Sequence, residues 1–225
     1  MNKTAILIGF GGMGKRYYKA LKLMKFNIIA ICEKKKNNVM NYKFEKNLKL
    51  TNNYKKLLNM HADLLCVASN TKSRFKILDS FCKKSSIKKI ITEKPLSISY
   101  KDSLAINKIA KKRKVRLIVN THRSFSPNFI MVDELFNRYG EKPSTIFINS
   151  PSAGLGNMGS TFFDLGFHFF KQNPNSVVGN IDKTGTINPR GKVFKDPGGH
   201  GIIYFNKNKK LFLTWVKIPA CLIPF

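Results

Sequence analysis

The stretch from Ala5 to Leu21, "AILIGFGGMGKRYYKAL", determines how this chain can be expected to fold. An apolar run of strand character ends at Gly9, and the residues after Gly14 have helical spacing. The glycines therefore form a G-x-G-x-x-G pattern between a strand and a helix. In that place Gly9 allows a tight turn, Gly11 lets the backbone approach a pyrophosphate, and Gly14 lets the helix pack closely. The alternative is a glycine-rich turn that binds nothing.

Two further features favour a bound dinucleotide. The backbone amides at the start of the helix, at Gly12 and Met13, have no partners within the helix and can bind an anion. Glu33 ends the next predicted strand, 19 residues after Gly14 (33 − 14), where an acidic residue binds the ribose hydroxyls of the cofactor. Its carboxylate would repel a 2′-phosphate, so we expect NAD. Lys34–Lys36 follow at once and could pair with that phosphate, which leaves NADP as the alternative.

The rest of the first half alternates short apolar runs with amphipathic stretches. Such alternation predicts an α/β fold, a doubly wound parallel sheet of the Rossmann type. The predicted strands are 4–9, 26–32, 63–69, 87–92 and 115–120, and the predicted helices are 12–25, 52–60, 72–84 and 99–113. We therefore expect a dinucleotide-binding domain over residues 1–121.

After residue 120 the pattern predicts an α+β domain with an open, mainly antiparallel sheet, over residues 122–225. "FNKNKKLF", residues 205–212, reads as the connection of a β-hairpin. The predicted helices are 127–139 and 159–171, and the predicted strands are 144–150, 177–182, 200–206 and 211–217. With no linker between the halves, the domains should pack directly.

The charge of the chain is strongly basic, with 41 Lys and Arg against 12 Asp and Glu, a formal net charge of +29. Such a charge can attract nucleic acid. The lysines are spread over every predicted surface in company with asparagines, and no nucleic-acid motif accompanies them. We therefore expect solvated faces and no nucleic-acid partner.

The lengths of the apolar runs and the positions of the cysteines indicate the cellular compartment. No apolar run approaches the roughly 18 residues of a membrane helix, and the N-terminus lacks the order of a signal peptide. These features predict a cytoplasmic protein with no membrane partner. The four cysteines, Cys32, Cys66, Cys82 and Cys221, form no C-x-x-C pair, so we expect reduced packing residues.

Two motifs carry candidate chemistry. Glu93-Lys94-Pro95 follows a predicted strand at its carboxyl end, the edge at which open α/β sheets place their ligands, so Lys94 would face the cofactor; the alternative is one more surface lysine. Asp164 and His168 stand four residues apart on one face of a predicted helix. A histidine can take a proton near neutral pH, whereas the alternative is a hydrogen-bonded core pair. Neither H-E-x-x-H nor a Cys/His cluster appears, so we expect no metal.

Taken in order, six features of residues 1 to about 170 resemble those of the Gfo/Idh/MocA oxidoreductases: "GFGGMG", the acid Glu33, "VASNTKSR", "EKPL", "NTHRSFSP" and "DLGFH". The resemblance implies NAD(P)-linked transfer of a hydride at a carbinol of a sugar, nucleotide sugar or cyclitol. It implies that Lys94, Asp164 and His168 are catalytic. It also implies substrate binding by Arg123 together with Lys94 and His168, and cofactor binding by Ser69, Asn70, Glu93 and Lys94 in addition to the glycines and Glu33.

The chain also departs from the family pattern. After the predicted strand 63–69 the family often has T-P-x-x-x-H. This chain has Ser69-Asn70 in place of Thr-Pro, and Arg74 in place of the histidine. The family runs on through several more strands, which predicts a small or incomplete second domain here. In the family the open face of that sheet forms subunit contacts, so the apolar runs "IIYF" and "LFLTWV" predict a homo-oligomer. A catalytically impaired, cofactor-binding scaffold remains the alternative to an enzyme, and nucleic-acid binding is a third.

Overall fold

The computed structural model describes residues 3–150, 154–187 and 195–215. The chain divides into two compact units, Met1–Asn120 and Thr121–Phe225, and each is described by itself. Residues 216 and 217 of the last predicted strand, and Cys221, lie outside the described residues. No helix in the described ranges is both long enough and apolar enough to cross a membrane.

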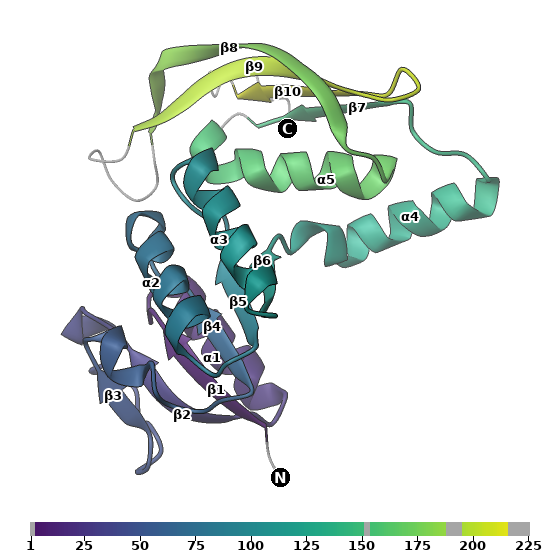
Figure 1. Cartoon of the computed structure of the whole chain (residues 1–225). Coiled ribbons are helices and arrows are strands. Elements are labelled where there is room, and N and C mark those ends of the chain that lie inside the picture. Colours follow the sequence, from purple (N-terminus) through teal and green to yellow (C-terminus); the bar gives the residue numbers. More distant parts are fainter. Residues whose placement is uncertain (1–2, 151–153, 188–194, 216–225) are drawn as a thin grey trace. The chain divides into compact units, whose positions relative to one another are not determined.

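The first unit is built on a six-stranded parallel sheet with the order β3-β2-β1-β4-β5-β6 (Figure 1). Its helices are α1 (Gly12–Leu23), α2 (Thr71–Lys84) and α3 (Tyr100–Lys112). Its strands are β1 (Thr4–Ile8), β2 (Asn27–Cys32), β3 (Lys49–Thr51), β4 (Leu64–Val67), β5 (Lys89–Glu93) and β6 (Arg116–Asn120). The order reverses direction at β1, which confirms the predicted doubly wound sheet.

The central strands of this sheet are buried on both faces, and the alternation along β1 shows why its sequence is continuously apolar. Ile6 and Ile8 pack in a cluster with residues of α2 and α3, such as Phe81. Ala5 and Leu7 point the other way, into a second cluster with residues of α1. A strand covered on both sides needs apolar residues at every position, which is the pattern of a parallel sheet.

One predicted element of this unit is wrong. The segment 52–60 forms only a 3₁₀ helix, η2 (Tyr54–Leu57), and the short strand β3 precedes it. The Asn53 side chain accepts a hydrogen bond from the Lys55 N–H at 3.0 Å and caps the turn. Leu57 is the one buried residue of η2, so no apolar face of several turns can hold a longer helix. β3 is three residues long and mostly exposed, which is too little for a recognisable pattern. A second 3₁₀ helix, η1 (Lys36–Asn38), follows β2.

The second unit packs helix α5 (Ser160–Phe170) against a four-stranded sheet with the order β7-β10-β9-β8. β10 pairs in parallel with β7 and antiparallel with β9, and β9 pairs antiparallel with β8, so the sheet is mixed and mainly antiparallel as predicted. Its strands are β7 (Thr145–Asn149), β8 (Pro174–Ile187), β9 (Lys195–Phe205) and β10 (Lys210–Trp215). α4 (Pro127–Tyr139) lies alongside, and η3 (Arg123–Phe125) and η4 (Leu155–Gly159) precede α4 and α5 (Figure 1).

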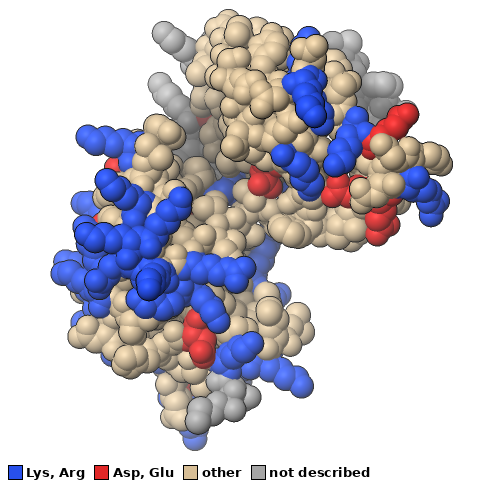
Figure 2. All heavy atoms as spheres, turned by 45° about the vertical axis from the view of Figure 1, so that its right-hand side comes forward, with Lys and Arg blue, Asp and Glu red and all other residues tan. Residues whose placement is uncertain are grey.

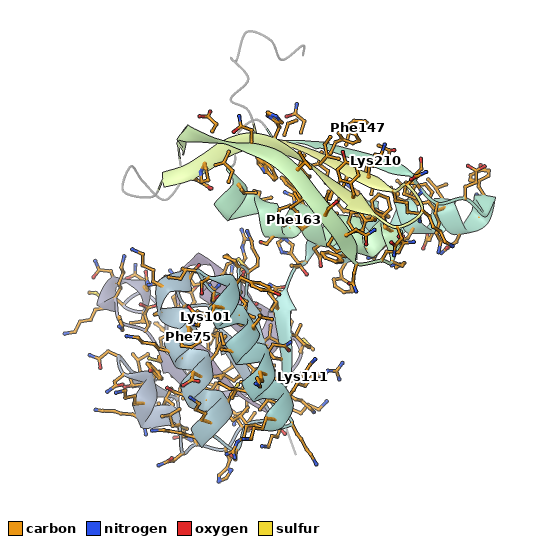
Figure 3. The ribbon with its side chains drawn as sticks, turned by 45° about the horizontal axis from the view of Figure 1, so that its top comes forward. Phe75, Lys101, Lys111, Phe147, Phe163 and Lys210 are labelled. Atoms are coloured by element: carbon orange, nitrogen blue, oxygen red, sulfur yellow. The ribbon has the colours of Figure 1, made fainter. Side chains whose placement is uncertain are left out.

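Helix α5 packs against one face of this second sheet, and the opposite face is more exposed. The alternate residues Leu211, Leu213 and Trp215 pack with Phe162 and other residues of α5 in one buried cluster. On the opposite face Phe147 is 74% exposed and stacks on Phe212 with ring centroids 4.6 Å apart. Figure 3 shows Phe147 on the side of the sheet away from α5 and Phe163 on the α5 side.

Five of the eight apolar residues that the structure describes in "IIYF" and "LFLTWV" are therefore buried within the chain itself. Ile203, Phe205 and Leu211 belong to the cluster under α5. The residues that alternate with them, such as Ile202 and Phe212, point to the other face and are half-buried. The homo-oligomer predicted through this sheet stays a prediction, and it depends on the narrower set that includes Phe147 and Phe212.

Candidate functional site

The glycine-rich loop between β1 and α1 is built by close packing of backbone on backbone. Gly9 has a φ of +91°, and a Cβ atom there would lie 2.8 Å from the carbonyl carbon and oxygen of Ala68. A Cβ atom on Gly14 would lie 2.0 Å from the Gly9 carbonyl oxygen. The Gly9 N–H donates to the Cys32 carbonyl at 2.7 Å, which joins the loop to the end of β2. Gly9 and Gly14 are thus required by the fold itself.

The other two glycines of the loop have open space instead. A Cβ atom on Gly11 or Gly12 would meet no atom within 4 Å. Gly11 is the N-cap of α1, and as a glycine it has no side chain to cap the helix amides. The first turn of α1, which includes Met13, carries no acidic residue. The start of α1 therefore presents its amides and the positive end of the helix dipole without a competing carboxylate. These features fit the pyrophosphate of a dinucleotide.

The carboxylate of Glu33 lies directly beside this loop. Its Oε2 accepts a hydrogen bond from the Phe10 N–H at 2.5 Å, and its Oε1 accepts one from the Lys35 N–H at 2.8 Å. Both bonds come from backbone, so the side chain is fixed at the carboxyl end of β2. Each carboxylate oxygen can accept a further bond, which fits the hydroxyls of an adenosine ribose.

The remaining predicted cofactor residues follow the next two strands. Ser69 and Asn70 come after β4, and Asn70 caps α2 because its Oδ1 accepts the Ser73 N–H at 2.9 Å. Lys94 comes directly after β5, is half-buried, and is joined to Pro95 by a cis peptide bond. β4 and β5 are neighbours in the sheet, so their carboxyl ends bring both segments to one edge.

Glu93 lies at the same edge but points into the protein. It is 7% exposed, and its Oε1 accepts hydrogen bonds from the Tyr17 hydroxyl and the Asn120 amide, both at 2.8 Å. Burial, together with the Glu93 carboxylate, raises the pKa of Tyr17 and keeps the phenol protonated as a donor. Tyr17 lies in the opening stretch and Asn120 begins "NTHRSFSP", but neither side chain has a local pattern that would predict its contact with Glu93. The trio ties α1, β5 and β6 together.

In the second unit, Arg123 and Asp164 lie where η3 packs against α5. The guanidinium of Arg123 stacks over the ring of Phe162 at 5.6 Å. The Ser124 hydroxyl donates to Asp164 Oδ2 at 3.4 Å. The segment that follows β6 and the helix that carries the D-x-x-x-H pair are thereby joined within this unit.

His168 contacts an acid that the sequence analysis missed. Its Nε2 lies 2.5 Å from Oδ2 of Asp133 on α4, and the two side chains are 20% and 32% exposed. Nε2 is enclosed by protein and makes no hydrogen bond of ordinary geometry with any residue that the structure describes. Asp133 is 35 residues away in sequence (168 − 133) on an amphipathic helix, and its carboxylate carries no local signal of a site.

An apolar pocket of about 370 Å³ lies between α5, β8 and β9, and it holds none of the predicted site residues. Its lining includes Phe163, Phe167, Val177 and Phe205. The other lining residues include the polar Asn175 and Ser176, and none of the lining residues is charged. Among residues 3–150, 154–187 and 195–215, no three His, Cys, Asp or Glu side chains cluster as a metal site would require.

Several solved structures share the fold of the whole chain. A putative oxidoreductase, yvaA, from Bacillus subtilis is 17% identical, with a TM-score of 0.79, and the match covers 98% of this chain and 66% of that one. The WlbA dehydrogenase from Bordetella pertussis, solved with NADH and UDP-GlcNAcA, is 13% identical, with a TM-score of 0.80 and coverage of 98% and 72%. A putative myo-inositol dehydrogenase from Sinorhizobium meliloti 1021 is 18% identical, with a TM-score of 0.77 and coverage of 97% and 70%. The chain thus spans about two thirds of the length of these relatives.

Sequence comparison gives the family directly. A search of curated proteins found no match. The family model GFO_IDH_MocA, described as "Oxidoreductase family, NAD-binding Rossmann fold", matches residues 3–121, which is more than half of the chain and contains the glycine loop, Glu33 and Lys94. The chain therefore belongs to the Gfo/Idh/MocA oxidoreductase family, and the Rossmann fold of its first unit is the NAD-binding fold of that family.

Proposed function

We propose that this protein transfers a hydride between a carbinol carbon of a sugar, nucleotide sugar or cyclitol and the nicotinamide of NAD. The observation that carries the proposal is the common edge of the parallel sheet, at which the glycine loop, Glu33 and Lys94 all follow the carboxyl ends of strands. The substrate class rests on the solved relatives, of which one holds UDP-GlcNAcA and another is described as a putative myo-inositol dehydrogenase.

Each unit carries its own part of this chemistry. When bound, NAD supplies the hydride acceptor at its nicotinamide. The ammonium of Lys94 would donate a hydrogen bond to the substrate hydroxyl and stabilise the negative charge that develops on its oxygen. His168 would take the proton of that hydroxyl, Asp164 would orient the group, and Arg123 would help to bind the substrate.

The surroundings of His168 select which ring atom takes the proton. Nε2 is enclosed against the Asp133 carboxylate, and two lone pairs 2.5 Å apart would repel each other. Electrostatics therefore favours a proton on Nε2, which leaves Nδ1 as the atom with a free lone pair. In this proposal Nδ1 of His168 is the base and Asp133 holds the ring in that tautomer.

Glu33 sets the preference for NAD over NADP. Both of its oxygens accept backbone hydrogen bonds, so the carboxylate cannot swing away from a ribose 2′-position at little cost. A 2′-phosphate placed there would meet an oriented negative charge. Lys34 and Lys36 are exposed, and they would counter that repulsion only in part.

The proposal is tested with the purified whole chain, NAD and a panel of nucleotide sugars, hexoses and cyclitols, by following NADH absorbance. Gly11→Val serves as the background control, because it removes the cofactor site. We expect turnover of at least one panel member by the wild type and none by the control. A wild type that binds NADH and turns over no member would favour the cofactor-binding scaffold.

A further inference from the structure

A buried arginine joins the two loops that follow β4 and β5. Arg74 is in the first turns of α2 and is 3% exposed. Its Nη2 donates to the Ser69 carbonyl at 2.6 Å, and its Nη1 donates to the Pro95 carbonyl. A fully charged guanidinium is rarely buried unless it is well bonded, and here one planar group bonds two backbone oxygens at once.

The two carbonyls belong to different βα connections. Ser69 follows β4, and Pro95 is the residue after Lys94 in the connection that follows β5. β4 and β5 are neighbours, with Val67 opposite Thr92. The guanidinium therefore fixes the position of the second loop relative to the first, at the edge where the cofactor binds.

The other neighbour of Lys94 is fixed as well. The Glu93 carboxylate accepts hydrogen bonds from Tyr17 and Asn120. Lys94 thus lies between a residue whose side chain is anchored and a residue whose carbonyl is anchored. Because both anchors are buried, the backbone at Lys94 has little freedom to move.

We propose that Arg74 is a positioning residue for Lys94: by bonding Ser69 and Pro95 it holds the β5–α3 loop so that the Lys94 ammonium faces bound NAD. This inference rests on the proposed function, which places Lys94 against the reacting groups. It assigns a role to a residue that touches neither cofactor nor substrate. A loop displaced by about 1 Å can cost on the order of 10²-fold in rate, so the role is measurable.

The test uses Arg74→Lys, which keeps the charge but cannot bond two carbonyls in a planar fork. Arg113→Lys is the matched control, since Arg113 also donates to a backbone carbonyl, that of Lys83 at 2.8 Å, and is exposed. Acetylation of Lys94 by an N-hydroxysuccinimide ester is followed by peptide mass spectrometry, with and without saturating NADH. NADH affinity is measured separately by fluorescence.

We expect NADH to protect Lys94 from acetylation in the wild type and in Arg113→Lys. In Arg74→Lys that protection should be lost while NADH affinity stays at the wild-type value, a combination that a general loss of structure would not produce. Equal protection in Arg74→Lys would overturn the positioning role alone. No protection in the wild type would overturn the placement of Lys94 and with it the proposed function.

A second measurement uses the wild-type protein alone and tests the hydrogen bonds of Arg74 directly. In ¹⁵N spectra of the wild type, the Nη protons of Arg74 should exchange slowly and give separate signals, because both nitrogens are bonded and buried. A single averaged signal for Arg74, like that expected for an exposed arginine, would contradict the bridge between the loops.

Discussion

Nε2 of His168 lies 2.5 Å from Oδ2 of Asp133, so the acid that contacts this histidine comes from α4 and not from its own helix. Asp164, four residues before His168, instead accepts a hydrogen bond from Ser124. The two acids of this region therefore have separate partners. One contacts the imidazole ring, and the other joins α5 to the segment that carries Arg123.

This contact predicts the tautomer of His168. Long-range ¹H–¹⁵N spectra of the wild type should place the proton on Nε2. Asp133→Asn removes the charge that favours this tautomer and should lower kcat by about 10- to 100-fold, part of the contribution of a general base, while NADH affinity stays the same. The exposed neighbour Glu134 offers the matched control Glu134→Gln. An Nδ1–H tautomer in the wild type would refute this assignment.

The four glycines of the loop should separate into two classes. Gly11→Val should abolish NADH binding by calorimetry and leave thermal stability near the wild-type value, because its side chain would occupy open space where the pyrophosphate binds. Gly14→Ala should destabilise the fold by about 1–3 kcal/mol or more, since its Cβ would overlap the Gly9 carbonyl. If Gly11→Val binds NADH as the wild type does, the loop is not the pyrophosphate site.

Substitution of Glu33 should change the cofactor preference. Repulsion between two unit charges near a protein surface is of order 1–4 kcal/mol, so Glu33→Gln should shift the ratio of NADP to NAD affinity by about tenfold or more towards NADP. Glu45→Gln is the control, because Glu45 pairs with Lys22 on the surface. An unchanged ratio in Glu33→Gln would mean that the carboxylate does not meet the ribose.

The buried thiols should make the fold sensitive to high pH. Burial raises the pKa of Cys66 to about 12 and that of Cys32 and Cys82 to about 11. A raised pKa in the folded state means that this stability is fully present below the unfolded value of about 8.5 and is lost as the pH rises towards 12. At pH 8, iodoacetamide should label Cys66 far more slowly in the native protein than in urea. Equal rates would show that Cys66 is not buried.

The first unit was predictable because its signals are local. Burial on both faces makes the central strands β1, β2 and β4 nearly continuous apolar runs. The glycines required at Gly9 and Gly14 form a fixed pattern with Glu33. β3 was missed, and η2 was predicted as a longer helix, since a three-residue exposed strand and a capped turn have no periodicity to detect.

The contacts that orient the candidate groups could not be predicted in the same way. Asp133 meets His168 only because α4 packs beside α5, and Tyr17 meets Glu93 only because α1 covers the sheet. Arg74 was visible in the sequence only as a departure from the family motif; its bonds to two loops arise from the fold. Such long-range contacts depend on packing, which single residues do not encode.

Most charged side chains of this protein are Lys or Arg, and most of these lie on its surface. Figure 2 shows one face of the molecule, on which Lys and Arg side chains lie on both units and most densely over the first. On α3, Lys101 and Lys111 are both exposed. An ordinary surface lysine such as Lys101, which is exposed, therefore provides a matched comparison for Lys94.

The most direct test of the proposed chemistry is the kcat of Lys94→Met against that of Lys101→Met, on the best panel substrate at saturating NAD. Loss of a fixed donor at a developing oxyanion costs about 10²- to 10³-fold, so Lys94→Met should lose that much kcat and retain wild-type NADH affinity, while Lys101→Met should match the wild type. Turnover of Lys94→Met within a few-fold of the wild type would remove Lys94 from the reaction and contradict hydride transfer at this edge of the sheet.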